Sequence, residues 1–168
     1  MAKEPKKLAE LFHDTLKDIY FAEKKIVTAL PKMARAAQRD ELRSAFEKHL
    51  RETEGQVKRL ERIFQIIEKT PQAKQCKAIL GILEEGQEVI KEYKGSPALD
   101  AGMLAAAQAV EHYEISRYGT LRTWAQELKL NEAVKLLEQT LAEEERTDET
   151  LTELAEICVN QEAQAEAA

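Results

Sequence analysis

Apolar residues recur along most of this chain at every third or fourth position, which is the spacing of one face of an α-helix. The stripes stop at clusters of turn-forming residues, namely Thr70-Pro71, Gly95-Ser96-Pro97 and Leu130-Asn131. A softer break lies at residues 38–40, where Asp40 is suited to cap a helix N-terminus. The pattern therefore predicts five helical segments, at residues 6–37, 41–69, 74–94, 98–129 and 132–159.

Each of the four long stripes turns polar near its middle. Glu23 borders the first stripe, and the residues that interrupt the others are His49, Thr53, Gln56, Glu111, Glu114, Glu144 and Asp148. Because these interruptions fall at a similar depth in every long helix, we expect polar side chains to meet inside the folded chain.

The two halves of the chain resemble each other. When Glu23 is aligned with Glu114, no gap is needed to bring Leu30 onto Leu121, Leu50 onto Leu141 and Leu60 onto Leu151. Short turns within each half predict two antiparallel hairpins, and the connection between them contains the shorter helical segment. We therefore predict an all-α, ferritin-like four-helix bundle with a short fifth helix in a long crossover. The bundle would occupy residues 1–160, followed by a frayed or disordered tail at residues 161–168.

The composition narrows the class of protein. The chain has 25 Lys and Arg against 31 Asp and Glu, a net charge of −6, which argues against a nucleic-acid binder with a basic face. Only six Gly and four Pro are present, so a sandwich or barrel with frequent turns is excluded. No signal peptide is visible, and the most apolar stretch, residues 101–110, is too short to span a bilayer. We expect a cytoplasmic protein whose two cysteines, Cys76 and Cys158, are reduced.

The polar middles of the helices suggest a metal site. Several carboxylates buried together are costly unless cations neutralise them, and carboxylates can bridge two cations. The candidate metal ligands are Glu23, His49, Glu52, Glu111, Glu114, Glu144 and Asp148. His49 precedes Glu52, which reverses the Glu-x-x-His order of di-iron bundles. An oxygen-rich set with one histidine suits two divalent ions of iron or manganese better than copper or zinc.

Each candidate also has a reading without metal. Glu23 can reach solvent from the edge of its stripe, and His49 can be a hydrogen-bonded core histidine. Glu52 can be an exposed helix charge. Glu111 and Glu114 can pair with Arg117 or Arg122, and Glu144 and Asp148 with a basic residue of a neighbouring helix.

Several motifs resemble the YciE/YciF-type ferritin-like bacterial stress proteins over about residues 6–160. They are Asp18-Ile-Tyr20-Phe-Ala-Glu23-Lys, His49-Leu-Arg-Glu52-Thr-Glu-Gly55-Gln56, Ala105-Ala-Ala-Gln108-Ala-Val-Glu111-His-Tyr-Glu114-Ile, Tyr118-Gly-Thr-Leu121 and Thr140-Leu-Ala-Glu-Glu-Glu145-Arg-Thr-Asp148. The resemblance implies a ferritin-like fold, a homodimer and expression under stress. It points to the same seven candidate ligands and supplies no reaction.

Three functions are compatible with this sequence. The leading hypothesis is a di-iron or di-manganese stress protein that reacts with O2, peroxide or Fe(II); no catalytic residue is assigned. The alternative is a non-catalytic structural or interaction protein whose polar core is a hydrogen-bonded network without metal. A cage-forming iron store is a third reading. No nucleic-acid or membrane partner is expected.

Overall fold

The computed structural model describes residues 5–164, and within this part the chain has no strand. The helices are α1 (Leu8–Ala36), α2 (Asp40–Ile66), α3 (Lys77–Glu92), α4 (Leu99–Glu127) and α5 (Asn131–Leu154), followed by a π-helical turn, η1 (Ala155–Val159), and α6 (Asn160–Glu162). All five predicted segments are confirmed, with bounds that shift by a few residues. Of the predicted tail, residues 165–168 lie outside the described residues.

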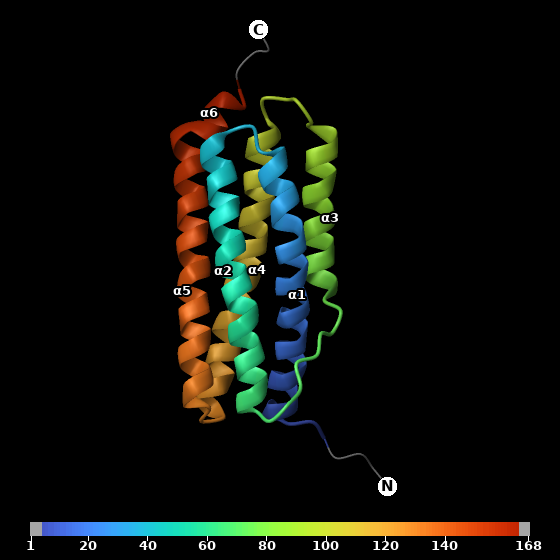
Figure 1. Cartoon of the computed structure of the whole chain (residues 1–168), viewed down its shortest axis with the longest axis vertical. Coiled ribbons are helices and arrows are strands. Elements are labelled where there is room, and N and C mark those ends of the chain that lie inside the picture. The colour runs from blue at the N-terminus through green and yellow to red at the C-terminus, as the bar shows by residue number, and fades with distance from the viewer. Residues whose placement is uncertain (1–4, 165–168) are drawn as a thin grey trace.

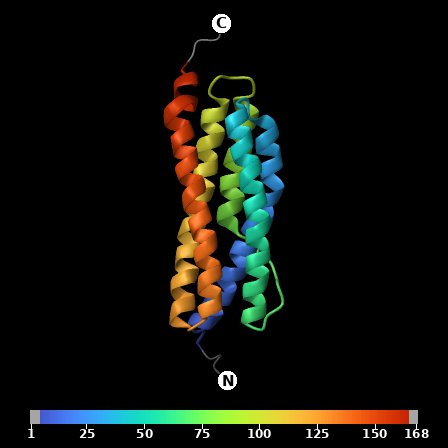
Figure 2. The same cartoon turned by 60° about the vertical axis from the view of Figure 1, so that its left-hand side comes forward.

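The four long helices run side by side as two hairpins, α1–α2 and α4–α5 (Figures 1 and 2). Helix α1 also packs against α4, and α2 also packs against α5, so each long helix has two long neighbours. The connection from α2 to α4 travels the length of the molecule and contains α3, which lies outside the four and contacts α4 and α1. The predicted pair of hairpins and the helix in the crossover are therefore confirmed.

The helices form because strong helix formers carry one apolar face that the neighbouring helices cover. Leu16, Phe46, Leu121 and Leu137 are examples of core side chains with almost no exposure. Helix α3 approaches α4 closely, since a Cβ atom at Gly102 would lie only 2.6 Å from Cγ1 of Val89. This core clamps the middles of the long helices against one another and so fixes where their polar residues meet.

The turn between α1 and α2 is held by a residue far away in the sequence. The sequence predicts Asp40 as the cap of α2, but Asp40 is the first helical residue and its exposed side chain pairs with Arg43. The turn is held instead by the buried carboxylate of Asp100, which accepts hydrogen bonds from the backbone N–H groups of Gln38 and Arg39 at 2.9 and 2.8 Å. This contact ties the top of the first hairpin to the start of the second.

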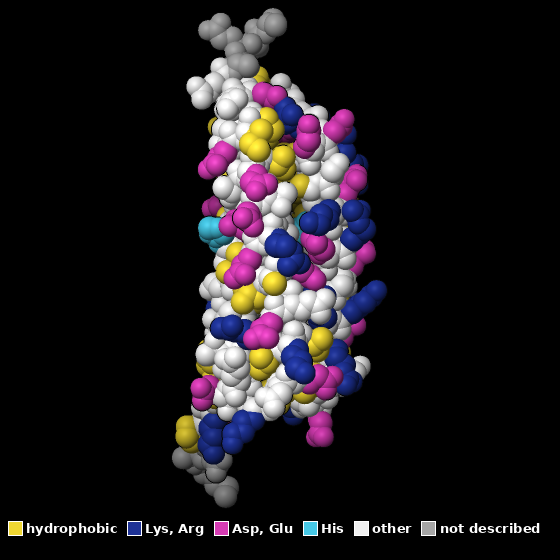
Figure 3. Space-filling model, turned by 90° about the vertical axis from the view of Figure 1, so that its left-hand side faces the viewer, with side chains coloured by type: hydrophobic (Ala, Val, Ile, Leu, Met, Phe, Trp, Pro, Cys, Tyr) yellow, Lys and Arg dark blue, Asp and Glu magenta, His cyan; other side chains and the backbone are white. Residues whose placement is uncertain are grey.

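The surface carries mixed charge. Acidic and basic side chains alternate over the flank shown in Figure 3, with small apolar patches between them. No helix in the described range is both long and apolar enough for a bilayer crossing. Cys76, at the start of α3, and Cys158, in η1, are both free thiols.

Candidate metal centre

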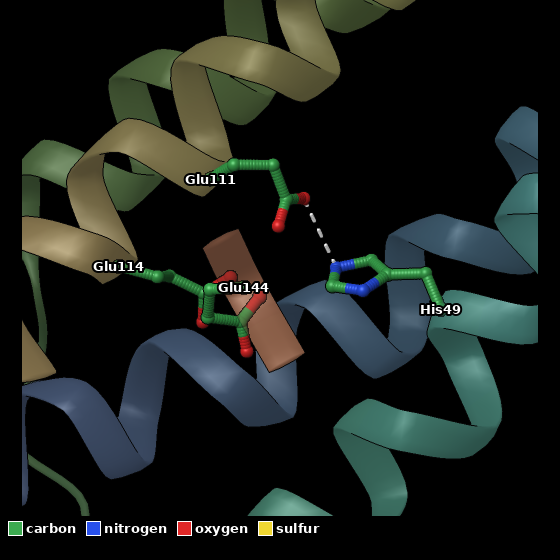
Figure 4. A group of neighbouring side chains, drawn as sticks. All are labelled: His49, Glu111, Glu114 and Glu144. Carbon is green, nitrogen blue, oxygen red and sulfur yellow. Dashed lines mark ion pairs between the residues drawn. The ribbon is translucent and has the colours of Figure 1, made fainter. Parts of the chain in front are cut away.

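Five side chains from the polar middles of the long helices meet inside the bundle. They are Glu23 of α1, His49 of α2, Glu111 and Glu114 of α4, and Glu144 of α5. Figure 4 shows four of them, from three different helices, pointing into one space. Each comes from the inward face of its helix, so the apolar residues one turn above and below hold it in place.

The site is compact. One ligand atom each from His49, Glu111, Glu114 and Glu144 can be chosen so that all four lie within 4.8 Å of one another. Nε2 of His49 lies 3.1 Å from Oε1 of Glu111. Nitrogen and oxygen ligands lie about 2.0–2.2 Å from a transition-metal ion, so ligands on opposite sides of one ion are about 4 Å apart. The spacing therefore suits a cation at the centre of the cluster.

These side chains are cut off from solvent. Glu23, Glu114 and Glu144 have no exposed surface, and Glu111 and His49 are only 1% and 4% exposed. Six of their carboxylate oxygens have no hydrogen-bonding partner among the described residues: Oε2 of Glu23, Oε2 of Glu111, and both oxygens of Glu114 and of Glu144. Buried polar atoms are almost always paired, so this many unpaired oxygens in one place require a ligand or protons.

Burial and mutual repulsion raise the pKa of every carboxyl in the cluster. Loss of hydration raises the pKa of Glu23 and of Glu111 to about 8. The pKa values of Glu114 and Glu144 also lie well above the ordinary value, because of burial first and neighbouring carboxylates second. A divalent ion would reverse this effect, since its charge favours the ionised carboxylates.

Glu23 belongs to the cluster through two contacts. When one of the two carboxyls is protonated, Glu23 and Glu114 can share a hydrogen bond across the α1–α4 interface. The hydroxyl of Tyr118 donates a hydrogen bond to Oε1 of Glu23, and the Tyr118 side chain is completely buried. Tyr118 therefore orients Glu23 from the side away from solvent.

Two of the seven candidates lie outside this cluster. The side chains of Glu52 and Asp148 are each 23% exposed. Glu52 is 3.7 Å from Nζ of Lys48, and Asp148 contacts Gln108 and His112 of α4. Both still influence the cluster, because their negative charges help to raise the pKa of Glu111. The structure thus brings five of the seven candidates together and leaves these two at the border.

The expected arginine partners of the cluster are elsewhere. Arg117 lies over the ring of Tyr113, with its guanidinium carbon 5.3 Å from the ring centre. Within the described range, no salt bridge joins Glu111, Glu114 or Glu144 to a lysine or arginine. Since His49 is the only basic side chain in contact among the residues described, the cluster carries more negative charge than its own residues can neutralise.

Sequence reasoning missed the contribution of Tyr118. This residue lies on the apolar stripe of α4, and nothing in the sequence shows that its hydroxyl reaches a glutamate 95 positions earlier.

The internal repeat holds a second signal about the site. Aligning Glu23 with Glu114 also places Tyr20 on Glu111 and Thr53 on Glu144, so the second hairpin carries carboxylates where the first has neutral residues.

A group of this kind can hold a metal ion. Carboxylate oxygens with one imidazole nitrogen are the donors that iron and manganese accept, and the unpaired buried oxygens supply vacant coordination capacity. Carboxylates have two oxygens each and can bridge a pair of ions about 3.5–4 Å apart. The residues present therefore fit such a group.

Comparison with known proteins places the chain in a family. Residues 7–164 match the profile of DUF892, which is described as a domain of unknown function. The chain is 45% identical over 163 residues to protein YciF of Escherichia coli strain K12, covering 95% of this chain and 96% of that protein.

Solved structures agree with this match. The crystal structure of the E. coli stress protein YciF superposes with a TM-score of 0.89 at 42% identity, covering 94% of this chain and 99% of that one. YcfI of Rhodopseudomonas palustris is provisionally described as a structural protein. Its structure superposes with a TM-score of 0.85 at 39% identity, covering 90% of this chain and 97% of that one. A Xanthomonas campestris protein shares the fold, with a TM-score of 0.72 at 24% identity, covering 92% of this chain and 94% of that one. The expected resemblance is confirmed, and the chain belongs to the YciE/YciF-type stress protein family that the DUF892 profile describes.

Proposed function

We propose that this protein is a ferritin-like stress protein whose bundle core holds two divalent ions of iron or manganese. The ligands are the five clustered residues Glu23, His49, Glu111, Glu114 and Glu144. Two hairpins joined by one long crossover are the arrangement of ferritin-like bundles, which supports the fold assignment. The name of the E. coli relative, a stress protein, supports a role under stress, which we place in the bacterial cytoplasm.

The burial of four carboxyl groups around a single histidine carries this proposal. Six oxygen atoms without protein partners are held together by a rigid apolar core, which is costly unless cations are bound. Bridging by two or more of these carboxylates would neutralise the charges and satisfy the oxygens. Copper and zinc sites draw more heavily on nitrogen and sulfur, so iron or manganese fits this donor set best.

The residues of the chain define what the site does. The clustered carboxylates and His49 would hold the ions, Tyr118 orients Glu23, and the apolar layers above and below exclude bulk water. When bound, a pair of such ions would supply redox chemistry in which the ions or added Fe(II) are oxidised and O2 or peroxide is reduced. The buried site admits only small substrates of that kind, because its residues are almost completely covered.

Metal content tests the proposal. Untagged protein is reloaded anaerobically with Fe(II) or Mn(II), and bound metal is counted by mass spectrometry. We expect about two ions per chain, as in two-metal sites. We expect Glu114→Ala to abolish stoichiometric uptake and the exposed control Glu145→Ala to retain it. Less than one ion in the wild type, or full uptake by Glu114→Ala, would refute the assigned site.

A metal-free network of hydrogen bonds is the second candidate, because burial raises the pKa of Glu23 and of Glu111 when no ion is bound. With pKa values of about 8, Glu23 and Glu111 hold protons at neutral pH, and each can then hydrogen-bond to a neighbouring carboxylate. The provisional description of the Rhodopseudomonas relative as structural agrees with this reading. Chelation separates the two: a structural network keeps its thermal unfolding temperature after EDTA treatment, whereas a metal protein loses several degrees.

We also propose that the protein forms a homodimer through the outer face of α1 and α2. Shallow grooves along this seam are lined by partly buried apolar residues such as Val27, Leu50 and Val57. Lys24 and Lys58 border the same grooves as Glu54 and Glu61, so a second copy turned by 180° can present opposite charges. Sedimentation velocity distinguishes a dimer from a monomer and from a large shell.

A further inference from the structure

An ion cannot reach the buried cluster without crossing the packed helices. The five clustered residues are at most 4% exposed. A route must therefore begin at a partly exposed donor that lies next to the cluster. Glu52 lies three residues after His49 on α2, Asp148 lies four residues after Glu144 on α5, and each side chain is 23% exposed, so these two are the candidates.

The surroundings of these two carboxylates differ. Nζ of Lys48 lies 3.7 Å from Oε1 of Glu52. The positive charge of Lys48 therefore repels a cation that approaches the Glu52 carboxylate. Further along α2, an ion pair between Arg59 and Glu143 closes the seam with α5. No lysine or arginine pairs with Asp148 within residues 5–164. The charge distribution therefore favours the Asp148 side.

Asp148 is held at the seam between α4 and α5. Gln108 Nε2 donates a hydrogen bond to its Oδ1 at 3.3 Å and to Oγ1 of Thr152 at 2.8 Å. His112 Nε2 lies 3.1 Å from Oδ1 of Asp148, and the His112 side chain is 68% exposed. Asp148 and His112 thus present an oxygen and a nitrogen donor side by side at the surface.

Asp148 and His112 each lie next to a buried glutamate of the cluster along their own helix. Glu111 precedes His112 on α4, and Glu144 lies one turn before Asp148 on α5. Both glutamates are buried and have oxygens without partners, namely Oε2 of Glu111 and both oxygens of Glu144. The donors therefore run from exposed to buried along two adjacent helices.

We propose that Asp148 and His112 form a transit site through which a divalent cation passes from solvent to Glu111 and Glu144. The cation exchanges part of its water shell for the Asp148 carboxylate and the His112 imidazole, and then moves to the unpaired oxygens inside. Asp148 is thus a residue for uptake and is not a ligand of the final site. This inference rests on the proposed metal centre.

Uptake kinetics test the transit site without any turnover. Metal-free protein is mixed anaerobically with Mn(II), and loss of the aqueous Mn(II) paramagnetic resonance signal is followed in time. We expect Asp148→Asn to slow uptake by about tenfold or more, while the final stoichiometry stays at the wild-type value. We expect His112→Gln to slow it as well. The matched control Glu145→Gln removes an exposed charge from the same helix and should change the rate less than about twofold.

The outcomes are separable. If the wild type binds Mn(II) but Asp148→Asn takes it up at the wild-type rate, the transit site is refuted and the metal centre stands. Slower uptake by Glu52→Gln alone would move the route to the α2 side and overturn the proposal. A lower final stoichiometry in Asp148→Asn would make Asp148 a ligand, which also overturns it. If the wild type binds no Mn(II), both the metal centre and the transit site are refuted.

Discussion

His49 and Glu111 face each other across the centre of the bundle, with Nε2 of His49 3.1 Å from Oε1 of Glu111. They belong to α2 and α4, which start at the same end of the molecule and occupy opposite corners of the four-helix arrangement. Their contact therefore passes through the bundle interior. The nitrogen and the oxygen that meet there are both donors that a metal ion would use, so substitutions of this pair report on the proposed centre.

Replacing His49 should impair metal binding selectively. The imidazole is the one nitrogen donor of the cluster, and His49→Gln leaves a polar side chain of similar reach in its place. We expect the affinity for Mn(II) to fall by more than about 100-fold, because loss of a residue that merely orients a ligand costs about 10- to 100-fold. Isothermal titration calorimetry measures this. His13→Gln, a half-buried histidine near the start of α1, is the matched control and should bind normally. Equal affinities for the two variants would contradict the assigned ligand role.

The stability of the metal-free protein should fall as the pH rises from 6 to 8. Glu23 and Glu111 have pKa values of about 8 in the folded chain and ordinary values near 4.5 when unfolded. Between these values the folded state binds more protons, so raising the pH favours unfolding, by up to about 1.4 kcal/mol per pH unit for each group. Urea denaturation at both pH values measures the decline.

Two comparisons check the cause of that decline. The Glu23→Gln, Glu111→Gln double variant cannot titrate at these positions and should show a flatter dependence on pH. Protein loaded with Mn(II) should also lose the decline, because its carboxylates are already ionised. Metal-free wild type that is more stable at pH 8 than at pH 6 would show that the buried carboxyls do not control its stability.

Tyr118 should stabilise the fold through its hydroxyl. This group donates a hydrogen bond to Glu23 in a site without solvent, and the bond also lowers the pKa of Glu23 against the larger effect of burial. Tyr118→Phe keeps the ring but leaves Oε1 of Glu23 without its donor, which should cost about 1–3 kcal/mol in the free energy of unfolding. Denaturant titration measures the loss. Tyr93→Phe, at a residue 45% exposed, should be neutral, and an equally neutral Tyr118→Phe would rule out the orienting role.

The helices and most of the cluster can be predicted from the sequence because periodicity reports burial directly. Glu111, Glu114 and Glu144 interrupt apolar stripes, Glu23 borders one, and all four are buried. A stripe does not fix the rotation of a helix about its axis to better than a fraction of a turn. Asp148 lies four residues after Glu144, yet its side chain stays 23% exposed and turns to α4. The sequence therefore predicts that the stripe contains buried carboxylates, but it does not predict which residues at the edge of the cluster are buried and which are exposed.

Contacts between distant residues are also beyond sequence reasoning. The Tyr118–Glu23 hydrogen bond joins the two hairpins, and which side chains meet there depends on how far each helix slides along its neighbour. The predicted Asp40 cap is wrong for a related reason. A local rule selects the nearest acidic residue, whereas the packing of α4 brings Asp100 to the backbone N–H groups of Gln38 and Arg39, just before α2 begins.

Asp100 should therefore contribute more to stability than its position in the sequence suggests. Its two oxygens accept the N–H groups of Gln38 and Arg39 while it is only 4% exposed, and bonds to a charged acceptor are stronger than neutral ones. Asp100→Ala leaves both donors unpaired and opens the contact between the hairpins, which should cost about 1.5–3 kcal/mol in the free energy of unfolding. Asp40→Ala, in the same turn but with an exposed side chain, should cost less than about 1 kcal/mol. Denaturant titration of both variants without metal decides the matter: if Asp40→Ala is the more damaging, the local cap controls this turn and the contact from α4 does not.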